Sequence, residues 1–176
     1  LDEIEEFLTG MRRAEDIATV LATVLCIKIA GLENENEVKL KKWQDFLKDS
    51  HIYVHRKLEL FKGREISFDE QGLLATFDGP ARAIRCALAI TESARRLNIR
   101  VKTGLHTGKC DVVNGRYGGL ALEIAGKIAD RSEAGDVLVS RTVKDLVAGS
   151  GLSFREQAGK SHMDPQGEWK LFSVKR

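Results

Sequence analysis

The fold is decided by the stretch Gly63-Arg64-Glu65-Ile66-Ser67-Phe68-Asp69-Glu70-Gln71-Gly72-Leu73-Leu74-Ala75-Thr76-Phe77. It predicts two short strands joined by a polar turn over residues 69–72, because Gly72 supplies the positive-φ backbone that a tight hairpin favours. Alternation along the two arms places Ile66, Phe68, Leu74 and Thr76 on one face. A hairpin tip that carries acidic and amide groups is a common place for a binding site, although polar tips are more often plain solvated turns.

Hydrophobic periodicity predicts the remaining elements. Val20–Ile29 is an apolar run rich in β-branched residues, which is typical of a central strand buried on both faces. Helices are expected at 34–61, 80–97, 120–130 and 141–148. Strands are expected at 100–106 and 110–113, joined by a turn at 107–109, and at 136–140, 152–157 and 168–174. This order predicts an α+β fold with helices packed on one face of a sheet.

The first residues form a separate feature. Leu1, Ile4, Leu8 and Met11 recur at spacings of three and four, which predicts a linker helix over residues 1–16 with a coiled-coil stripe. Such a short helix needs a partner or an upstream helix to be stable. The chain begins with Leu1 rather than Met, so we expect an upstream domain in a longer protein. Residues 17–176 are the main domain.

Composition narrows the functional classes. The chain of 176 residues has 28 Lys+Arg against 26 Asp+Glu, a net charge of +2, which argues against nucleic acid or an anionic membrane as partner. Absence of an apolar run of about 20 residues and of a signal peptide favours a cytoplasmic location. Cys26, Cys86 and Cys110 form no CxxC pair, so neither a disulfide framework nor a zinc site is expected. His51 and His55 have i,i+4 spacing but lack the Glu of an HExxH motif, which favours a surface helix face.

A family resemblance rests on several motifs in a fixed order. They are Leu21-Ala22-Thr23-Val24-Leu25 with Gly31, Gly63-Arg64-Glu65, Gly72–Pro80, Ala81-Arg82-Ala83-Ile84, Gly104–Gly108, Leu120–Ile128 and Gly135–Ser140. Together they resemble the catalytic domain of class III nucleotidyl (adenylate and guanylate) cyclases, over roughly residues 20–175. Asp78-Gly79-Pro80 resembles a bacterial branch. The resemblance implies a ferredoxin-like cyclase fold with a mostly antiparallel sheet.

The family reaction cyclises a nucleoside triphosphate with two Mg²⁺ or Mn²⁺ ions, which two aspartates hold. By the resemblance, those two positions are occupied here by Lys28 and Gln71. Asp69 and Glu70 are the nearest substitute carboxylates, but a rescue would also have to neutralise Lys28. We therefore expect no bound metal cofactor.

The family's substrate positions also differ from the pattern. The resemblance aligns the purine-reading positions with Ser67 and Arg116, the ribose and transition-state positions with Glu123 and Lys127, and the phosphate-binding lysine with Met163. Only Lys127 keeps its charge type. All seven positions, the two metal positions included, are non-standard, so the chain is expected to be a degenerate member of the family.

The leading hypothesis is a pseudocyclase that acts as a dimerisation or regulatory module in signalling, as a homodimer or with another cyclase domain. One alternative is an enzyme half-site that is active only with a complementary cyclase partner. Another is a metal-free nucleotide or anion sensor that uses Lys28, Arg116 and Lys127. Lys28 is expected to pair within the cleft with Glu123 or with an acid of the Asp69-Glu70 turn, because an unpaired cation in a cleft is costly.

Overall fold

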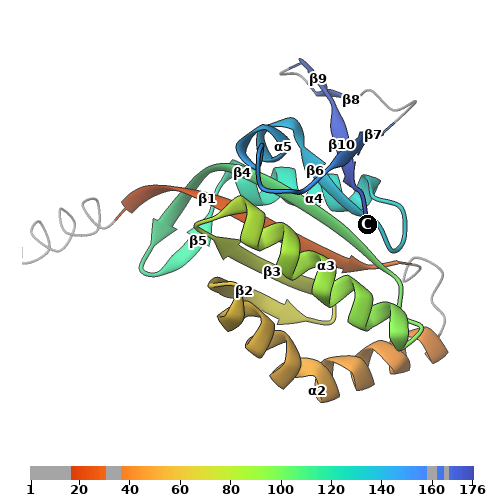
Figure 1. Ribbon diagram of the computed structural model, residues 1–176. Helices are drawn as coiled ribbons and strands as arrows, with labels where there is room; N and C mark the ends of the chain where they lie inside the picture. The colour runs from red at the N-terminus through yellow and green to blue at the C-terminus, as the bar shows by residue number, and fades with distance from the viewer. Residues whose placement is uncertain (1–16, 31–36, 158–161, 165–166) are drawn as a thin grey trace, which may run out of the picture.

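The computed structural model describes residues 17–30, 37–157, 162–164 and 167–176 (Figure 1). The linker helix predicted for residues 1–16 lies outside the described residues. No helix in the described part of the chain is long and apolar enough to cross a membrane.

Two long strands form the centre of the sheet. Strands β1 (Ile17–Ile29) and β4 (Val101–Val113) pair antiparallel along their whole length, from Ile17 opposite Val113 to Ile29 opposite Val101. The turn predicted at residues 107–109 is therefore wrong. These residues continue β4, because β1 offers a ladder partner for every one of them. Gly108 serves helix packing instead, since a Cβ there would lie 3.3 Å from Ala121 Cβ.

The other strands extend this centre on both sides. The order is β2-β3-β1-β4-β6-β10-β7, with β5 also paired to β4. Only β4 and β6 pair in parallel among the described strands of this sheet. The bounds are β2 Gly63–Asp69, β3 Gly72–Phe77, β5 Arg116–Gly118, β6 Val137–Ser140, β7 Phe154–Glu156 and β10 Leu171–Val174. Strands β8 (His162–Asp164) and β9 (Gly167–Trp169) form a separate pair, so the strand predicted at 168–174 is divided between β9 and β10. The predicted α+β, mostly antiparallel fold is confirmed.

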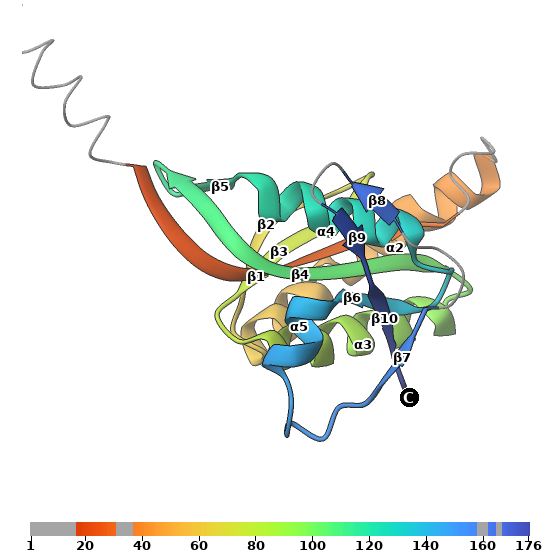
Figure 2. The same cartoon turned by 90° about the horizontal axis from the view of Figure 1, so that it is seen from above.

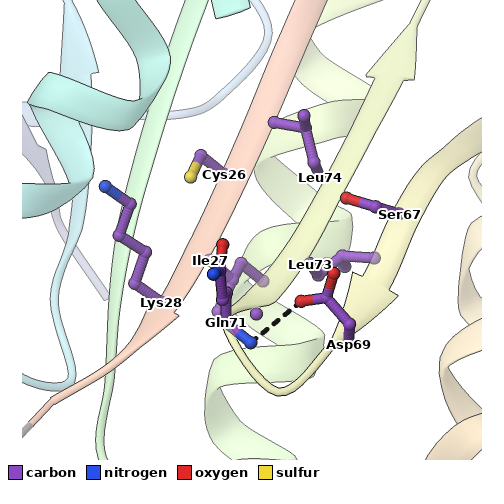
Figure 3. A pocket seen from close by; sticks show the side chains of 9 residues that line it. Cys26, Ile27, Lys28, Ser67, Asp69, Gln71, Leu73 and Leu74 are labelled. Atoms are coloured by element: carbon purple, nitrogen blue, oxygen red, sulfur yellow. Dashed lines mark hydrogen bonds between the residues drawn. The ribbon is translucent and has the colours of Figure 1, made fainter. Parts of the chain in front are cut away.

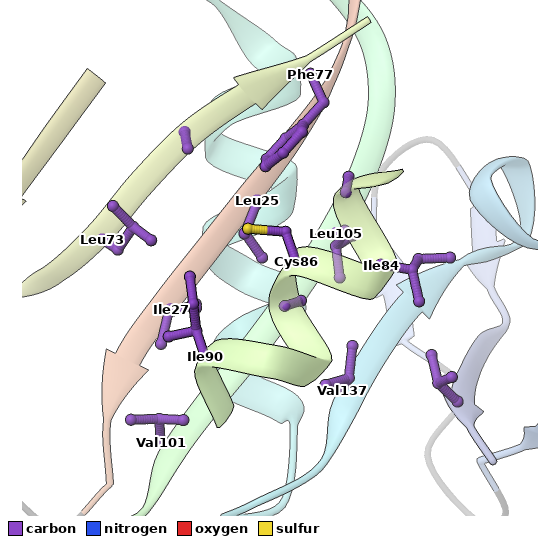
Figure 4. Packing of buried hydrophobic residues seen from close by; sticks show 14 of the residues in the cluster. Leu25, Ile27, Leu73, Phe77, Ile84, Cys86, Ile90, Val101, Leu105 and Val137 are labelled. Carbon is purple, nitrogen blue, oxygen red and sulfur yellow. The ribbon is translucent and has the colours of Figure 1, made fainter. Parts of the chain in front are cut away.

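Helices cover both faces of the sheet, which corrects the predicted one-sided arrangement (Figure 2). Helices α2 (Glu37–Leu60), α3 (Pro80–Arg96) and α5 (Arg141–Leu146) share one core with Leu25 and Ile27 of β1. Figure 4 shows the part of this core between β1 and α3. Helix α4 (Leu120–Arg131) packs on the opposite face, against Ala22, Val24 and Cys26. Because successive residues of β1 are apolar and point to opposite faces of the sheet, both faces must be buried against helices.

Small residues bring α4 close to the sheet. The helix presents Ala121, Ala125 and Ala129 to the strands. Opposite them, Gly104 has no room for a side chain, since a Cβ there would lie 2.3 Å from the Ala129 backbone nitrogen. This close packing fixes the last turn of α4 beside the end of β1.

The predicted hairpin is confirmed as β2 and β3, but its predicted face is wrong. The register shifts between Glu65 and Ser67, which is a β-bulge. Beyond the bulge Phe68 pairs with Leu73 and packs against the core of α2 and α3, whereas Leu74 packs on the α4 side. One extra residue reverses the alternation, which the pattern of apolar residues could not reveal.

Candidate functional site

A cavity of about 150 Å³ lies between the end of β1 and the hairpin β2–β3 (Figure 3). Its wall is formed by Cys26, Ile27, Lys28, Ser67, Asp69, Gln71, Gly72, Leu73 and Leu74. It opens on the α4 side of the sheet, because Ser67 and Leu74 pair across the hairpin and Leu74 packs with the α4 cluster.

The tip of the hairpin is held tightly against β1. Gly72 pairs with Lys28 in the β1–β3 ladder. It has a φ of 133°, and a Cβ there would lie 1.9 Å from the Ile27 carbonyl oxygen. The turn is closed by Asp69, whose Oδ1 accepts a hydrogen bond of 2.8 Å from the Gln71 backbone N–H. Glycine is thus required for close approach as well as for turn conformation.

Lys28 is part of the cavity wall, but its charged ammonium group lies outside the cavity. In Figure 3 the side chain points away from Asp69 and towards α4. It passes Gly126, where an added Cβ would be 3.7 Å from Nζ, and ends 2.7 Å from Asp130 Oδ1. The side chains of Lys28 and Asp130 are 37% and 61% exposed, so this is a surface ion pair.

An ion pair for Lys28 was predicted correctly, but the predicted partners were wrong. Glu123 lies in the first turn of α4, and Asp130 is seven residues further on, about 10 Å along the helix axis. Lys28 reaches the last turn of α4 because small residues dock that turn beside the end of β1. The Asp69-Glu70 turn lies on the other side of the strand end, and Asp69 uses its oxygen to close the hairpin.

Cys26 contributes a protonated thiol to the wall. Burial raises the pKa of this thiol to about 11, and the nearby Lys28 charge offsets this only in part, while Asp130 adds to it. A thiolate is the form of cysteine that attacks or binds metal. Cys26 therefore behaves as a small apolar wall residue at neutral pH.

Sequence comparison finds neither a matching family model nor a matching curated protein. Structure comparison finds close matches. The catalytic core of a rhodopsin-guanylyl cyclase with converted specificity, in complex with ATPalphaS, has a TM-score of 0.77 and 14% identity, over 90% of this chain and 98% of that one. An adenylate/guanylate cyclase/hydrolase from Silicibacter pomeroyi has a TM-score of 0.75 and 21% identity, over 89% and 97%. The non-canonical dimeric guanylyl cyclase domain of the RhoGC fusion protein from Blastocladiella emersonii has a TM-score of 0.72 and 14% identity, over 89% of this chain and 97% of that one.

The chain has the fold of adenylyl and guanylyl cyclase catalytic domains. Within this cyclase fold, the structure brings four of the sequence-predicted site residues together in one cavity: Lys28, Ser67, Asp69 and Gln71. Lys28 lies in β1, Ser67 and Asp69 lie in β2, and Gln71 lies in the turn between β2 and β3.

The other predicted positions lie elsewhere in the cyclase fold. Arg116 in β5 and Glu123 and Lys127 on α4 are exposed and do not line the cavity. Glu70 is exposed at the hairpin tip. Met163 belongs to β8, and its side chain lies outside the described residues. Asp130 was missed because the sequence offers no signal for it beyond a carboxylate near a predicted helix end.

The donor set does not fit the two divalent ions that the cyclase fold implies. Of the described residues in the cavity wall, Asp69 is the one carboxylate, and its Oδ1 already accepts the Gln71 N–H. Gln71 offers a neutral amide, and Lys28 is cationic. Hard cations bind through several oxygen ligands with compensating negative charge. This cavity lacks that charge.

Proposed function

We propose that this domain is a cyclase homology domain without cyclase chemistry, a pseudocyclase that acts as a dimerisation or regulatory module. The observation that carries the proposal is the composition of the cavity, where Lys28 and Gln71 stand beside a single carboxylate. Two-metal catalysis needs ions that stabilise both the attacking and the leaving oxygen. A cavity wall with a single carboxylate supplies too little negative charge to hold them.

A projecting arm of the sheet supports a partnering role. The first half of β1 and the last half of β4 run together beyond the helices (Figure 1). Ile17 and Val113 face each other across the two strands, and Leu21 lies on the same side; these side chains are 56%, 39% and 69% exposed. Grouped exposed apolar side chains indicate a protein–protein contact. Among structures of the same fold, the B. emersonii domain is found as a non-canonical dimer and also as a monomer, and we extend the dimeric arrangement to this chain as part of the proposal.

A half-site enzyme is the second candidate. It is favoured by the exposure of Arg116, Glu123 and Lys127, because exposed groups on β5 and α4 are accessible to the cleft of a partner domain. The anion-sensor hypothesis has less support. Lys28 is paired with Asp130, and neither Arg116 nor Lys127 lines the cavity, so their charges are not gathered there.

Turnover assays test the proposal. The purified domain, at micromolar concentration, is incubated with ATP or GTP and with Mg²⁺ or Mn²⁺, and cyclic nucleotide is measured. We expect none. Cyclic nucleotide that disappears in Asp69→Asn, but persists in the matched control Asp78→Asn outside the cavity, would overturn the proposal and indicate a relocated metal site.

The same assay distinguishes the half-site enzyme from the pseudocyclase. Activity that appears only on mixing with a cyclase domain that has intact metal aspartates would support the half-site. Loss of that activity in Lys127→Ala would show that α4 supplies the surface that completes the partner's cleft. A thermal shift with nucleotide but no turnover in any mixture would instead favour the sensor, because a ligand that binds the native state raises its stability.

A further inference from the structure

We propose that His51 and His55 of α2 and Glu65 of β2 bind one transition-metal ion of the zinc class. One ligand atom from each residue can be chosen so that all three lie within 4.8 Å of one another. Two imidazole nitrogens and one carboxylate oxygen form a ligand set that zinc accepts, with a fourth position left for water or another ligand.

The two histidines are brought together by the helix. They are four residues apart on α2, so they lie on the same helix face one turn apart. Their ring centroids are 4.4 Å apart at an interplanar angle of 61°. His55 Nε2 is 3.6 Å from Glu65 Oε1. A tetrahedral ion with bonds of about 2.0–2.2 Å holds its ligand atoms about 3.3 Å apart, so the widest pair must close by about 1.5 Å. His51 is exposed and the other two are half-buried, which leaves room for such side-chain rotations.

The β-bulge of the hairpin completes the cluster. The shift between Glu65 and Ser67 lets both Glu65 and Phe68 face α2, although three positions separate them. Phe68 stacks on His51 with centroids 5.8 Å apart and planes at 19°. This contact holds the His51 ring on the side of α2 that faces β2. The bulge therefore supplies both the third ligand and a support for the first.

One carboxylate oxygen of Glu65 lacks a hydrogen bond. Its Oε1 is shielded from solvent and accepts no hydrogen bond from any described residue. The 3.6 Å to His55 Nε2 is beyond hydrogen-bonding distance. A shielded carboxylate oxygen without a hydrogen bond is destabilising, and a bound cation would remove that cost.

The site is separate from the cavity between β1 and the hairpin, because Ser67 and Asp69 point to the α4 side while Glu65 points to α2. Strand β2 is the edge of the sheet. A bound ion would join α2 to that edge strand, so we assign it a structural role. This inference does not depend on whether the domain is a pseudocyclase.

The test uses the full chain after chelator treatment and dialysis. Zn²⁺ is titrated by calorimetry, and Co²⁺ is followed by visible absorption, which reports the geometry and ligands of the ion. We expect saturable 1:1 binding, a raised melting temperature with Zn²⁺, no shift with Mg²⁺, and a Co²⁺ spectrum without thiolate charge transfer.

Variants identify the ligands. His51→Ala and Glu65→Gln should each weaken Zn²⁺ binding by more than the roughly 10–100-fold that loss of an outer-shell partner causes. The matched control Glu59→Gln, an exposed carboxylate on the same helix, should bind as the parent chain does. Melting of the metal-free variants verifies that they are folded. Absence of saturable binding, or binding that both ligand variants retain, would overturn the proposal.

Discussion

Lys28 Nζ lies 2.7 Å from Asp130 Oδ1, and this ion pair joins the end of β1 to the last turn of α4. A carboxylate near a helix C-terminus is unfavourable, because the helix dipole places negative partial charge there. The Lys28 ammonium offsets that repulsion. The lysine that the resemblance aligns with a metal position thus stabilises a helix end outside the cavity.

Breaking this pair should have a small effect on stability. Lys28→Met and Asp130→Asn should each lower the free energy of unfolding by less than about 1 kcal/mol, because the partners are 37% and 61% exposed. Urea unfolding of the two single variants and the double variant gives their coupling. A coupling above about 2 kcal/mol would contradict this and indicate a desolvated pair.

Adding one methyl group at Gly72 should have a large effect. Gly72→Ala should lower the free energy of unfolding by more than about 2 kcal/mol, because the new Cβ would meet the Ile27 carbonyl oxygen at 1.9 Å and the φ is 133°. Gly115→Ala is the matched control. Gly115 has a φ of 74° and no atom within 4 Å of an added Cβ, so only the backbone strain of about 1–2 kcal/mol applies. Equal losses in the two variants would show that close approach to β1 contributes nothing.

The sequence predicted most of the fold because its signals are local. The apolar run of β1, the hairpin turn at Gly72 and the helix after Asp78-Gly79-Pro80 are all encoded by neighbouring residues. The continuity of β4 through Thr107-Gly108-Lys109 was missed because it depends on pairing with β1, more than 80 residues away. Gly108 looked like a turn residue, whereas it accommodates α4.

The site was predicted less completely for the same reason. The resemblance pointed to Lys28, Gln71 and Ser67 as family positions and to Asp69 as a substitute carboxylate, and the structure places all four in one cavity. Asp130 and Glu65 could not be found in this way, because each acts on a partner from another element. The missing carboxylate beside His51 and His55 lies on β2 rather than on their own helix, and a bulge turns it towards them.

His106 should make stability depend on pH. Burial lowers the pKa of its imidazole to about 4, from an ordinary value of 6.5. Its Nδ1 lies 2.9 Å from Ser140 Oγ, and its ring packs against Trp169. Between these two pH values the unfolded chain binds more protons than the folded one, so stability falls as the pH falls. The loss should reach at most about 3 kcal/mol by pH 4.

Urea unfolding from pH 7.5 to pH 4 measures this dependence. Carboxylates also titrate in the lower part of this range, so His106→Gln serves as the control. The difference between the parent chain and the variant isolates the histidine. It should be constant above about pH 7 and shrink as the pH falls through 6.5. A difference that stays unchanged down to pH 4 would contradict a buried neutral imidazole.

Leu21→Asp should disrupt self-association without unfolding the domain. Leu21 is 69% exposed on the apolar side of the β1–β4 arm, beside Ile17 and Val113, so its substitution changes the monomer's free energy of unfolding by no more than about 0.5 kcal/mol. In a dimer that buries this arm, the aspartate would leave a charge unpaired in an apolar contact, and such a charge weakens association strongly.

Leu60→Asp is the matched control, because Leu60 is 67% exposed at the end of α2, away from the arm. Sedimentation velocity at micromolar concentration should show a dimer for the parent chain and for Leu60→Asp, and a monomer for Leu21→Asp. A parent chain that sediments as a monomer, or a Leu21→Asp variant that remains dimeric, would exclude the arm as the contact surface.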